Sequence, residues 1–389
     1  MQGGLGDFCV FPLLFPLPFL LPCKRLVFCY NAGKRPGGTP GSQDWKGGAG
    51  LPRWEQPRGH GMKLLVTGAA GFIGSHFVDF TLQAHPEDQV IGLDKLTYAG
   101  SLDNLAQHRG DGRFRFVQGD ICDRKLLASL LEDAQVDCIV NFAAESHVDR
   151  SLDSPDLFLE SNVQGVCALL DMVNRFRVPR FHQVSTDEVY GQLPLDPSAP
   201  PFQEDSPLRP SNPYAASKAA ADLLALSYFR CFATPVTITR SANNYGPRQV
   251  PEKLIPRMIR LADAGQPLPL YGDGKNVRDW LYVRDHCAAV DLVVRKGRLG
   301  EVYNVGGGCQ RSNLELVRLL LERMGKDPSL ICFTTDRPGH DRRYALCWDK
   351  LRRQLGWQPT VDFDTGIRDT LHWYRSHPGF GQLPSPADP

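Results

Sequence analysis

Three glycines spaced three residues apart constrain the fold of this chain more than any other feature. Gly68, Gly71 and Gly74 directly follow the apolar run Lys63–Val66 and open a segment with helical spacing. Glycine permits a tight turn and a close approach of the backbone to a phosphate. The N-terminus of the helix then offers free N–H groups and the positive end of the helix dipole. Strand, glycine turn and helix in this order predict a dinucleotide-binding unit.

An acidic residue at the end of the next strand supports this interpretation. Gln89–Asp94 is typical of a strand, and Asp94 is where an acid binds the hydroxyls of an adenosine ribose. Because a carboxylate repels a 2′-phosphate, we expect NAD rather than NADP. Asp94 taken alone is also an ordinary residue for a turn. Asp120 and Ile121, at the end of the third predicted strand, are candidates for flanking the adenine.

Strand-like runs and helical patterns alternate along most of the chain. The expected strands are Lys63–Val66, Gln89–Asp94, Arg113–Asp120, Asp137–Ala144, Arg180–Thr186 and Pro235–Arg240. This alternation predicts an α/β fold, a doubly wound parallel Rossmann sheet with helices on both faces. After Asn243 the alternation breaks down, which indicates a smaller C-terminal substrate-binding lobe. One strand-like segment there, Glu301–Val305, is expected to return to the sheet.

These patterns divide the chain into four parts. We expect a disordered extension over residues 1–61 and a Rossmann domain over 62–245, with a returning segment near 271–307. A lobe follows over 246–375, and then a flexible tail over 376–389. The extension contains an apolar run, Phe8–Pro22, but four prolines interrupt it. It is also shorter than the ~20 residues of a membrane-spanning helix. A signal peptide would begin with basic residues, whereas the only charge before the run is Asp7. The hypothesis is that Met62 starts the working part.

Charge and cysteine content exclude several classes of protein. The net charge is +1 over 389 residues, without a basic run, which argues against nucleic-acid binding. Eleven cysteines occur without a C-x-x-C pair, which argues against a zinc ribbon and a disulfide framework. Reduced thiols in a cytoplasmic protein are the expectation. No set of His, Asp and Glu has the spacing of metal ligands, so no metal is expected.

A tyrosine and a lysine four residues apart form the candidate catalytic pair. Tyr214 and Lys218 lie in an alanine-rich segment that is predicted to be a helix, with Asn212 as its cap and Pro213 at its first position. Their spacing puts both on one helix face. The ammonium is expected to lower the pKa of the phenol, which then accepts a proton at neutral pH. An exposed pair at this spacing is common, but here it follows a dinucleotide loop in the same chain.

With these motifs the sequence resembles the extended short-chain dehydrogenase/reductase family. The resemblance implies that Lys218 also binds the nicotinamide ribose, and that Thr186, after the fifth strand, assists the tyrosine. The expected cofactor-binding residues are Gly68, Gly71, Phe72, Ile73, Gly74, Asp94, Lys95, Asp120, Ile121, Ala143, Ala144, Ser185, Tyr214, Lys218 and Asn243.

One short segment, Thr186-Asp187-Glu188, discriminates among the members of that family. Five further segments belong to the same pattern: "LDKLTYAGSLDNL", "AAESHVDRS", "NNYGP", "PEKLIP" and "DRPGHDRRY". Together they resemble the branch that dehydrates nucleotide sugars, over roughly Met62 to Tyr374. The resemblance implies dTDP-glucose as substrate, with UDP-glucose as the alternative; the sequence does not decide between thymine and uracil. It also implies a homodimer through helices around Asp156–Phe176 and Tyr214–Phe232.

The resemblance also assigns a role to each catalytic residue. Tyr214 removes the C4 hydroxyl proton while hydride leaves C4 for NAD⁺. Glu188 then removes the C5 proton as general base, and Asp187 protonates the departing C6 hydroxyl as general acid. The two carboxyl groups must therefore hold opposite protonation states. Their closeness favours this, because the first to ionise raises the pKa of the second.

Substrate contacts follow from the resemblance as well. The expected residues are Ser146, His147, Asn244, Lys253, Leu254, Arg278, Asn313, His340 and Tyr344. Taken singly, each Arg or Lys is by default a solvated surface charge. A decarboxylase or a 4-epimerase remains an alternative, although neither needs both an acid at Asp187 and a base at Glu188. A non-catalytic NAD-binding scaffold would need none of the five catalytic residues.

Overall fold

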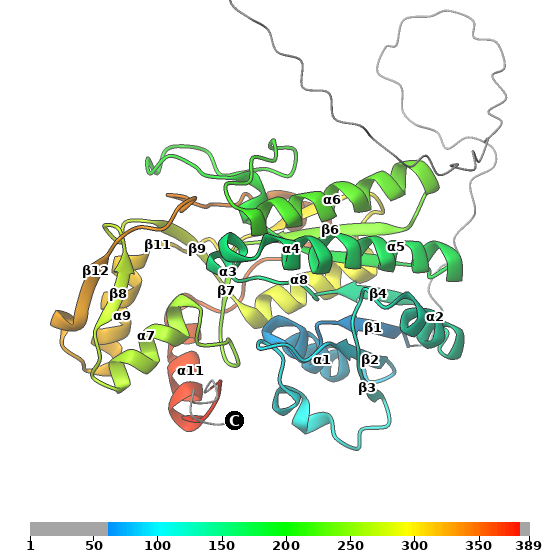
Figure 1. The fold of residues 1–389 in the computed structure, drawn as a ribbon, viewed down its shortest axis with the longest axis horizontal. Coiled ribbons are helices and arrows are strands. Elements are labelled where there is room, and N and C mark those ends of the chain that lie inside the picture. The colour runs from blue at the N-terminus through cyan, green and yellow to red at the C-terminus, as the bar shows by residue number, and fades with distance from the viewer. Residues whose placement is uncertain (1–60, 382–389) are drawn as a thin grey trace, which may run out of the picture. The chain divides into compact units, whose positions relative to one another are not determined.

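A seven-stranded parallel sheet lies at the centre of the computed structural model, which describes residues 61–381 (Figure 1). All neighbouring strands pair in parallel. Their order in space is β10 (Val302–Val305), β6 (Val236–Ser241), β5 (Phe181–Thr186), β4 (Cys138–Asn141), β1 (Lys63–Thr67), β2 (Gln89–Asp94) and β3 (Phe114–Gln118). β4, β5 and β6 are buried along their whole length. β4 is mainly apolar, as is typical of a central strand covered on both faces, whereas β5 and β6 also bury polar side chains such as His182 and Arg240.

Helices cover both faces of this sheet (Figure 1). On one face lie α1 (Phe72–Ala84) and α8 (Val283–Lys296), which share a core that includes Phe77 and Val290. On the other face lie α2 (Arg124–Asp133), α5 (Gly165–Phe176) and α6 (Pro213–Phe232). Their core includes Leu169 and Ala221. The predicted doubly wound α/β fold is confirmed.

The smaller lobe consists of short strands and three helices (Figure 1). β8 (Leu268–Tyr271) pairs in parallel with β12 (Ile331–Thr334). β9 (Val277–Tyr282) lies between β11 (Gln310–Ser312) and β7 (Asn243–Tyr245). α7 (Leu254–Asp263), α9 (Asn313–Met324) and α11 (Phe363–Ser376) pack around them in a separate core.

Shorter elements connect these parts. Several of them lie between β4 and β5, namely α3 (Val148–Asp153), α4 (Pro155–Leu159) and one turn of π-helix, η2 (Glu160–Gln164). The others are η1 (Leu102–His108), η3 (Asp187–Tyr190), η4 (Pro328–Leu330) and α10 (Asp349–Leu355). The helix expected over Asp156–Phe176 is therefore divided by the π-turn.

Two details of the sheet bear on the site. β4 ends at Asn141, three residues before its expected end, because the chain leaves the sheet there. β10 pairs with β6, so the segment expected to return does lie in the sheet. The domain boundary after residue 245 stays a prediction. The predicted N-terminal extension, except Gly61, and residues 382–389 of the predicted tail lie outside the described residues.

Within residues 61–381 no helix is both long enough and apolar enough to cross a bilayer.

Candidate active site

A pocket of about 330 Å³ lies at the carboxyl ends of the parallel strands. The strand order reverses there, with β2 on one side of β1 and β4 on the other, which is where open α/β sheets bind ligands. All residues expected to be catalytic or to bind the cofactor line this pocket. Of the expected substrate-binding residues, Ser146, Asn244 and Lys253 line it, whereas His147, Leu254, Arg278, Asn313, His340 and Tyr344 do not.

The glycine loop forms the floor of the cofactor end. Gly68 has a φ of +68°, and a Cβ there would approach the Ala143 nitrogen to 2.7 Å. A Cβ on Gly74 would overlap the carbonyl oxygen of Gly68, so that the helix could not pack on the turn. Gly71 is the N-cap of α1 and has no side chain to cap the helix. The first N–H groups of α1 are thus left for an anion.

Asp94 is held rigidly at the end of β2. Its carboxylate accepts hydrogen bonds from the backbone nitrogens of Ala70, at 2.9 Å, and Leu96, at 2.8 Å. Burial raises the pKa of this carboxyl, and the backbone hydrogen bonds oppose the shift. Nearby, Lys95 forms an ion pair of 2.6 Å with Asp120. These groups lie where the ribose and adenine of a dinucleotide are expected.

Unpartnered polar atoms show what this pocket is built to hold. The Ser185 hydroxyl and the side-chain carbonyl oxygens of Asn243 and Asn244 are buried without a hydrogen-bond partner. Buried polar atoms without partners are costly, so a ligand that supplies partners is favoured. The glycine cradle, the ribose-site acid and these atoms together fit a nicotinamide dinucleotide.

Tyr214 and Lys218 lie in the first turns of α6. Asn212 caps this helix by accepting a hydrogen bond of 2.8 Å from the Ala215 nitrogen, as predicted. The Lys218 ammonium donates to the Val184 carbonyl oxygen at 2.6 Å, and burial lowers its pKa to about 8. Burial, and then the charge of Glu188, raise the pKa of Tyr214. The expected lowering of the Tyr214 pKa is therefore wrong for this structure, because burial is the largest cause of the shift and raises the pKa.

The two adjacent acids lie where β5 turns into η3. The Thr186 hydroxyl accepts from the Glu188 nitrogen at 3.3 Å and donates to Asp187 Oδ1 at 3.3 Å. Asp187 is 1% exposed, and its Oδ2 has no partner. Burial, then Glu188 and Asp279, raise the pKa of Asp187 well above its usual range. Asp187 is thus the carboxyl that keeps its proton.

Glu188 has a different environment from its neighbour. Burial raises its pKa, but the charges of Arg337, Arg278 and Lys253 oppose the rise. The Asn212 amide also donates to Glu188 Oε2 at 3.5 Å. The largest opposing causes at Glu188 are the charges of Arg337, Arg278 and Lys253, whereas at Asp187 the charges of Glu188 and Asp279 add to the rise and that of Arg278 opposes it. The environment therefore divides the pair into an acid and a base.

Two of the expected substrate residues stack on each other near this pair. The Arg278 guanidinium lies 4.4 Å from the ring centre of Tyr344, and it donates to the Asp341 carbonyl oxygen at 3.0 Å. Both side chains act electrostatically on Glu188. His340 pairs with Asp336 at 2.6 Å, and burial lowers its pKa to about 4.

Four of the other expected substrate residues lie at or next to the starts of helices, whereas Asn244 lies in β7. Leu254 and Asn313 are the first residues of α7 and α9. His147 caps α3 by accepting from the Arg150 nitrogen at 3.2 Å. Lys253 donates to the Ser146 carbonyl oxygen at 2.7 Å.

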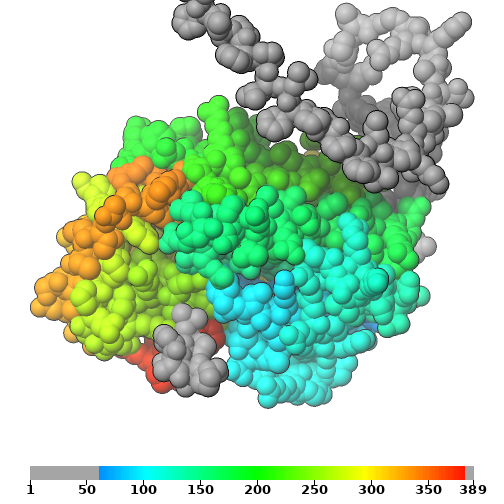
Figure 2. Space-filling view, in the orientation of Figure 1, coloured from blue at the N-terminus to red at the C-terminus, as the bar shows by residue number. Residues whose placement is uncertain are grey.

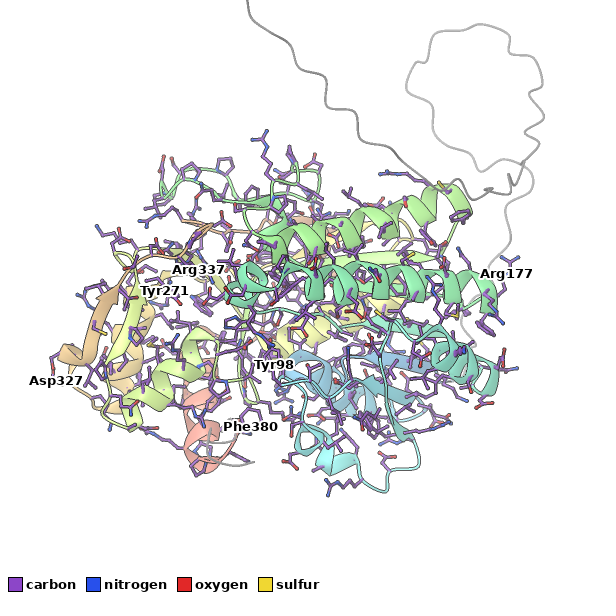
Figure 3. All side chains as sticks on the ribbon, in the orientation of Figure 1. Tyr98, Arg177, Tyr271, Asp327, Arg337 and Phe380 are labelled. Atoms are coloured by element: carbon purple, nitrogen blue, oxygen red, sulfur yellow. The ribbon has the colours of Figure 1, made fainter. Side chains whose placement is uncertain are left out.

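Sequence reasoning missed Arg337. This residue lies in "DRPGHDRRY", and its charge is the largest of those that oppose the pKa rise of Glu188. No signal in the motif separates it from Arg342, which pairs with Asp273 at 3.0 Å, or from Arg343, which donates to backbone carbonyls. Figure 3 labels Arg337 on the side of the smaller lobe, close to Tyr271. Within residues 61–381 no cluster of His, Cys, Asp and Glu could hold a metal ion.

The fold and the pocket define the class of this protein: a Rossmann-fold enzyme with a nucleotide cofactor beside an acid–base pair. The chain belongs to the GDP-mannose 4,6 dehydratase family, whose model matches residues 65–370.

Curated relatives and solved structures indicate which members of this family the chain resembles. A dTDP-glucose 4,6-dehydratase of an Actinoplanes species is 51% identical over 81% of this chain and 98% of the relative. The low-salt glycan biosynthesis protein Agl12 of Haloferax volcanii is 51% identical over 80% and 98%. The solved dTDP-glucose 4,6-dehydratase DesIV of Streptomyces venezuelae, with NAD and TYD bound, is 51% identical, covers 82% of this chain and 98% of its own, and has a TM-score of 0.79. The predicted resemblance to nucleotide-sugar dehydratases is confirmed.

Proposed function

We propose that this protein is an NAD-dependent hydro-lyase that converts dTDP-glucose to dTDP-4-keto-6-deoxy-glucose. One observation carries the proposal. Two adjacent carboxyls at the end of β5 lie in different electrostatic environments, in the same pocket as Tyr214 and the dinucleotide loop. Removal of water across C5 and C6 needs one base and one acid, whereas oxidation at C4 alone needs neither carboxyl. The names of the relatives and the NAD in the DesIV structure support the same reaction.

The tyrosine acts first. Tyr214 accepts the C4 hydroxyl proton, and Thr186 steadies its phenol by a hydrogen bond. NAD, held by the glycine loop, Asp94 and Lys218, supplies the hydride acceptor at C4 and the hydride that later returns to C6. The Lys218 ammonium stays buried beside Val184 and orients the ribose. Burial raises the pKa of the phenol, and a bound oxidised cofactor would supply a positive charge that favours the proton transfer.

The acid pair completes the reaction. The keto group at C4 makes the C5 hydrogen acidic, and Glu188 removes it. Asp187, which keeps its proton, donates it to the departing C6 hydroxyl, so that water leaves. Glu188 returns the proton to C5 as the sugar would take back the hydride at C6, and the proton that Tyr214 took from the C4 hydroxyl balances the one that Asp187 gave to the departing water. The two carboxyls thus need opposite protonation states at the start of elimination.

Substrate binding is proposed for the residues around this pair. Lys253 and Arg278 suit the diphosphate, with the backbone of Leu254 beside them. Ser146 and His147 suit the hexose, while Asn244, Asn313, His340 and Tyr344 suit the phosphates, the sugar or the nucleoside. We also propose that residues 246–375 form mainly this nucleotide-sugar lobe.

Compartment and assembly are proposed from the free thiols and the exposed apolar side chains. All eight cysteines within residues 61–381 are free, which fits a reducing cytoplasm. Leu159 in α4, and Leu223 and Phe232 in α6, are 49%, 55% and 52% exposed. Figure 2 shows the green surface of α3–α6 between the cyan surface and the yellow and orange surface of the smaller lobe. We infer that a second copy of the chain covers these side chains in a homodimer.

Incubation of the purified protein with dTDP-glucose and, separately, UDP-glucose tests the reaction. We expect a product lighter by one water from dTDP-glucose, detected by mass spectrometry. A faster reaction of UDP-glucose would make the uridine nucleotide the substrate, and no product from either would refute the dehydratase. A 4-epimer or a product lighter by carbon dioxide would establish the alternative reactions.

Two variants test the division of roles within the pair. Asp187→Asn should still oxidise C4 but lose elimination by at least ~100-fold, because general acid catalysis contributes that much. Glu188→Gln should stop uptake of deuterium at C5. Asp205→Asn, at an exposed acid away from the pocket, is the control. Full turnover of either pocket variant would contradict the assignment.

A further inference from the structure

An ion pair joins the two lobes at the edge of the acid–base site. Arg337, in the loop after β12, pairs through Nη1 with Asp149 Oδ1 in α3 at 2.8 Å. Tyr271, at the end of β8, donates to the other oxygen of the same carboxylate at 3.1 Å. Asp149 lies in α3, which follows β4 in the larger domain, and its carboxylate contacts two side chains of the smaller lobe. Figure 3 labels Tyr271 and Arg337 close together in this region.

The Arg337 side chain is 21% exposed, and its Nε is buried without a hydrogen-bond partner. Within residues 61–381, Asp149 is the one acidic side chain that forms an ion pair with it. The position of this guanidinium thus depends on Asp149 alone among the acids.

The loop that carries Arg337 packs beside the residues that contact Glu188. A Cβ on Gly339, two residues after Arg337, would lie 2.7 Å from the Ser211 carbonyl oxygen and 3.7 Å from Asn212 Cβ, and the Asn212 amide donates to Glu188 Oε2. The charge of Arg337 opposes the pKa rise of Glu188. Yet the described structure has no ion pair between Arg337 and Glu188. A direct ion pair would occupy the oxygens of Glu188 that must accept the proton. A guanidinium released to solvent would lose its influence, because interactions between charges weaken with distance and hydration.

We propose that Asp149 is a positioning residue: it holds the Arg337 guanidinium near Glu188 but not paired with it, so that the Glu188 oxygens stay free to accept a proton. This inference rests on the proposed role of Glu188 as base. Asp149 itself lies away from the pocket lining and is not a catalytic residue.

Other charged groups surround both ends of this arrangement. Around Glu188 they are Asp187, Lys253, Arg278, Tyr214 and Tyr344. Around Asp149 they are His147, Tyr271 and Arg337. Within residues 61–381 no ion pair joins the first group to Asp149, so Arg337 is the direct link from Asp149 toward Glu188, and His147 with Lys253 is the indirect one.

Single-turnover measurements on the NAD-bound protein with its sugar nucleotide test this inference. Deuterium uptake at C5 reports the base step, and absorbance of the reduced cofactor reports oxidation at C4. We expect Asp149→Ala to slow C5 uptake on the order of tenfold, the effect of one pKa unit on a base, and to leave C4 oxidation within about twofold. Asp149→Asn, which keeps the shape and one acceptor, should lose less, and Asp149→Glu should restore most of the rate. Asp153→Ala, an exposed acid in the same helix, is the matched control.

A double variant separates positioning from a structural contact. If Asp149 acts through Arg337, then Asp149→Ala combined with Arg337→Ala should be no slower at C5 than Arg337→Ala alone. Additive losses, equal losses in both steps, or unchanged C5 uptake in Asp149→Ala would each overturn the inference. If one of these outcomes is found while Glu188→Gln still loses deuterium uptake at C5, only the role of Asp149 is refuted, and Glu188 is still supported as the base. Retention of C5 uptake in Glu188→Gln would instead refute the proposed base itself.

Discussion

At the scale of single residues, the buried carboxyl of Asp187 that suits acid catalysis also lowers the stability of the folded protein as the pH rises. Burial, Glu188 and Asp279 raise its pKa, so the folded protein binds this proton more tightly than the unfolded chain does. The stability that this proton contributes is complete below the unfolded pKa of about 4. It is lost as the pH rises from there through the folded pKa, because the folded state must then bury a charge. The acid that catalysis needs is therefore a cost to the fold at neutral pH.

This opposition predicts how Asp187→Asn changes thermal stability. An amide does not ionise, so the melting temperature of the variant minus that of the wild type should increase from pH 4 to pH 8. A gain on the order of 2–4 °C corresponds to about 1 kcal/mol in domains of this approximate size. Thermal scans across this pH range measure the difference. A difference that is constant or falls with pH would contradict the buried, protonated carboxyl.

Residue identities were easier to predict than residue environments. Asp187, Glu188, Tyr214 and Lys218 follow from motif order, and all four line the pocket. The pKa of Tyr214 was predicted in the wrong direction, because helix spacing shows a neighbour but not the depth of burial. Arg337 was missed because its partner Asp149 is 188 residues away in the sequence. No local pattern carries such a contact.

At the scale of elements, the glycines of the loop before α1 serve two purposes. One is the packing of the helix on the turn, and the other is space for the ligand. Gly74 is needed for packing, since a Cβ there would overlap the Gly68 carbonyl oxygen. Gly71 has more room within the protein, since its Cβ would lie 3.3 Å from the same oxygen. Gly71 instead leaves space for the ligand at the start of α1. Substitution of Gly74 should therefore lower the stability of the protein, whereas substitution of Gly71 should mainly weaken ligand binding.

Alanine at each position tests this distinction. Gly74→Ala should lower the melting temperature of the cofactor-free protein by several degrees and weaken NAD binding. Gly71→Ala should change that temperature little but weaken NAD binding at least ~10-fold, which is about 1.4 kcal/mol. Calorimetric titration with NAD and thermal scans without it give the two quantities. Equal loss of stability in both variants would show that Gly71 also serves the packing.

Long strands and helices were predicted within a few residues, whereas the short elements were not. β1, β2 and β4 are mainly apolar, and α6 begins at Pro213 as its cap indicates. By contrast, β7 and β11 have three residues each and exist only because they pair with β9. Their sequences carry no strand signal. The π-turn that divides the expected helix before α5 likewise has no local mark.

At the scale of the whole molecule, two features connect the lobes: strand β10 and the ion pair between Asp149 and Arg337. β10 brings the chain of the smaller lobe back to β6, while Arg337 reaches from that lobe to α3. The proposed substrate residues of the smaller lobe are thus fixed relative to the cofactor loop. The exposed large apolar side chains of residues 61–381 include Leu159 on α4, and Leu223 and Phe232 on α6. Exposed apolar side chains grouped on one surface mark interaction sites.

Leu223→Glu tests whether these helices form the dimer. Leu223 is 55% exposed on α6, so a charge there is tolerated in the monomer but would be buried between two copies, at a cost of several kcal/mol. We expect the variant to sediment as a monomer at micromolar concentrations at which the wild type is a dimer. Phe333→Glu is the matched control, because Phe333 is 57% exposed on β12 in the other lobe. If the wild type is a monomer, or if Phe333→Glu dissociates it while Leu223→Glu does not, the dimer does not use α4 and α6.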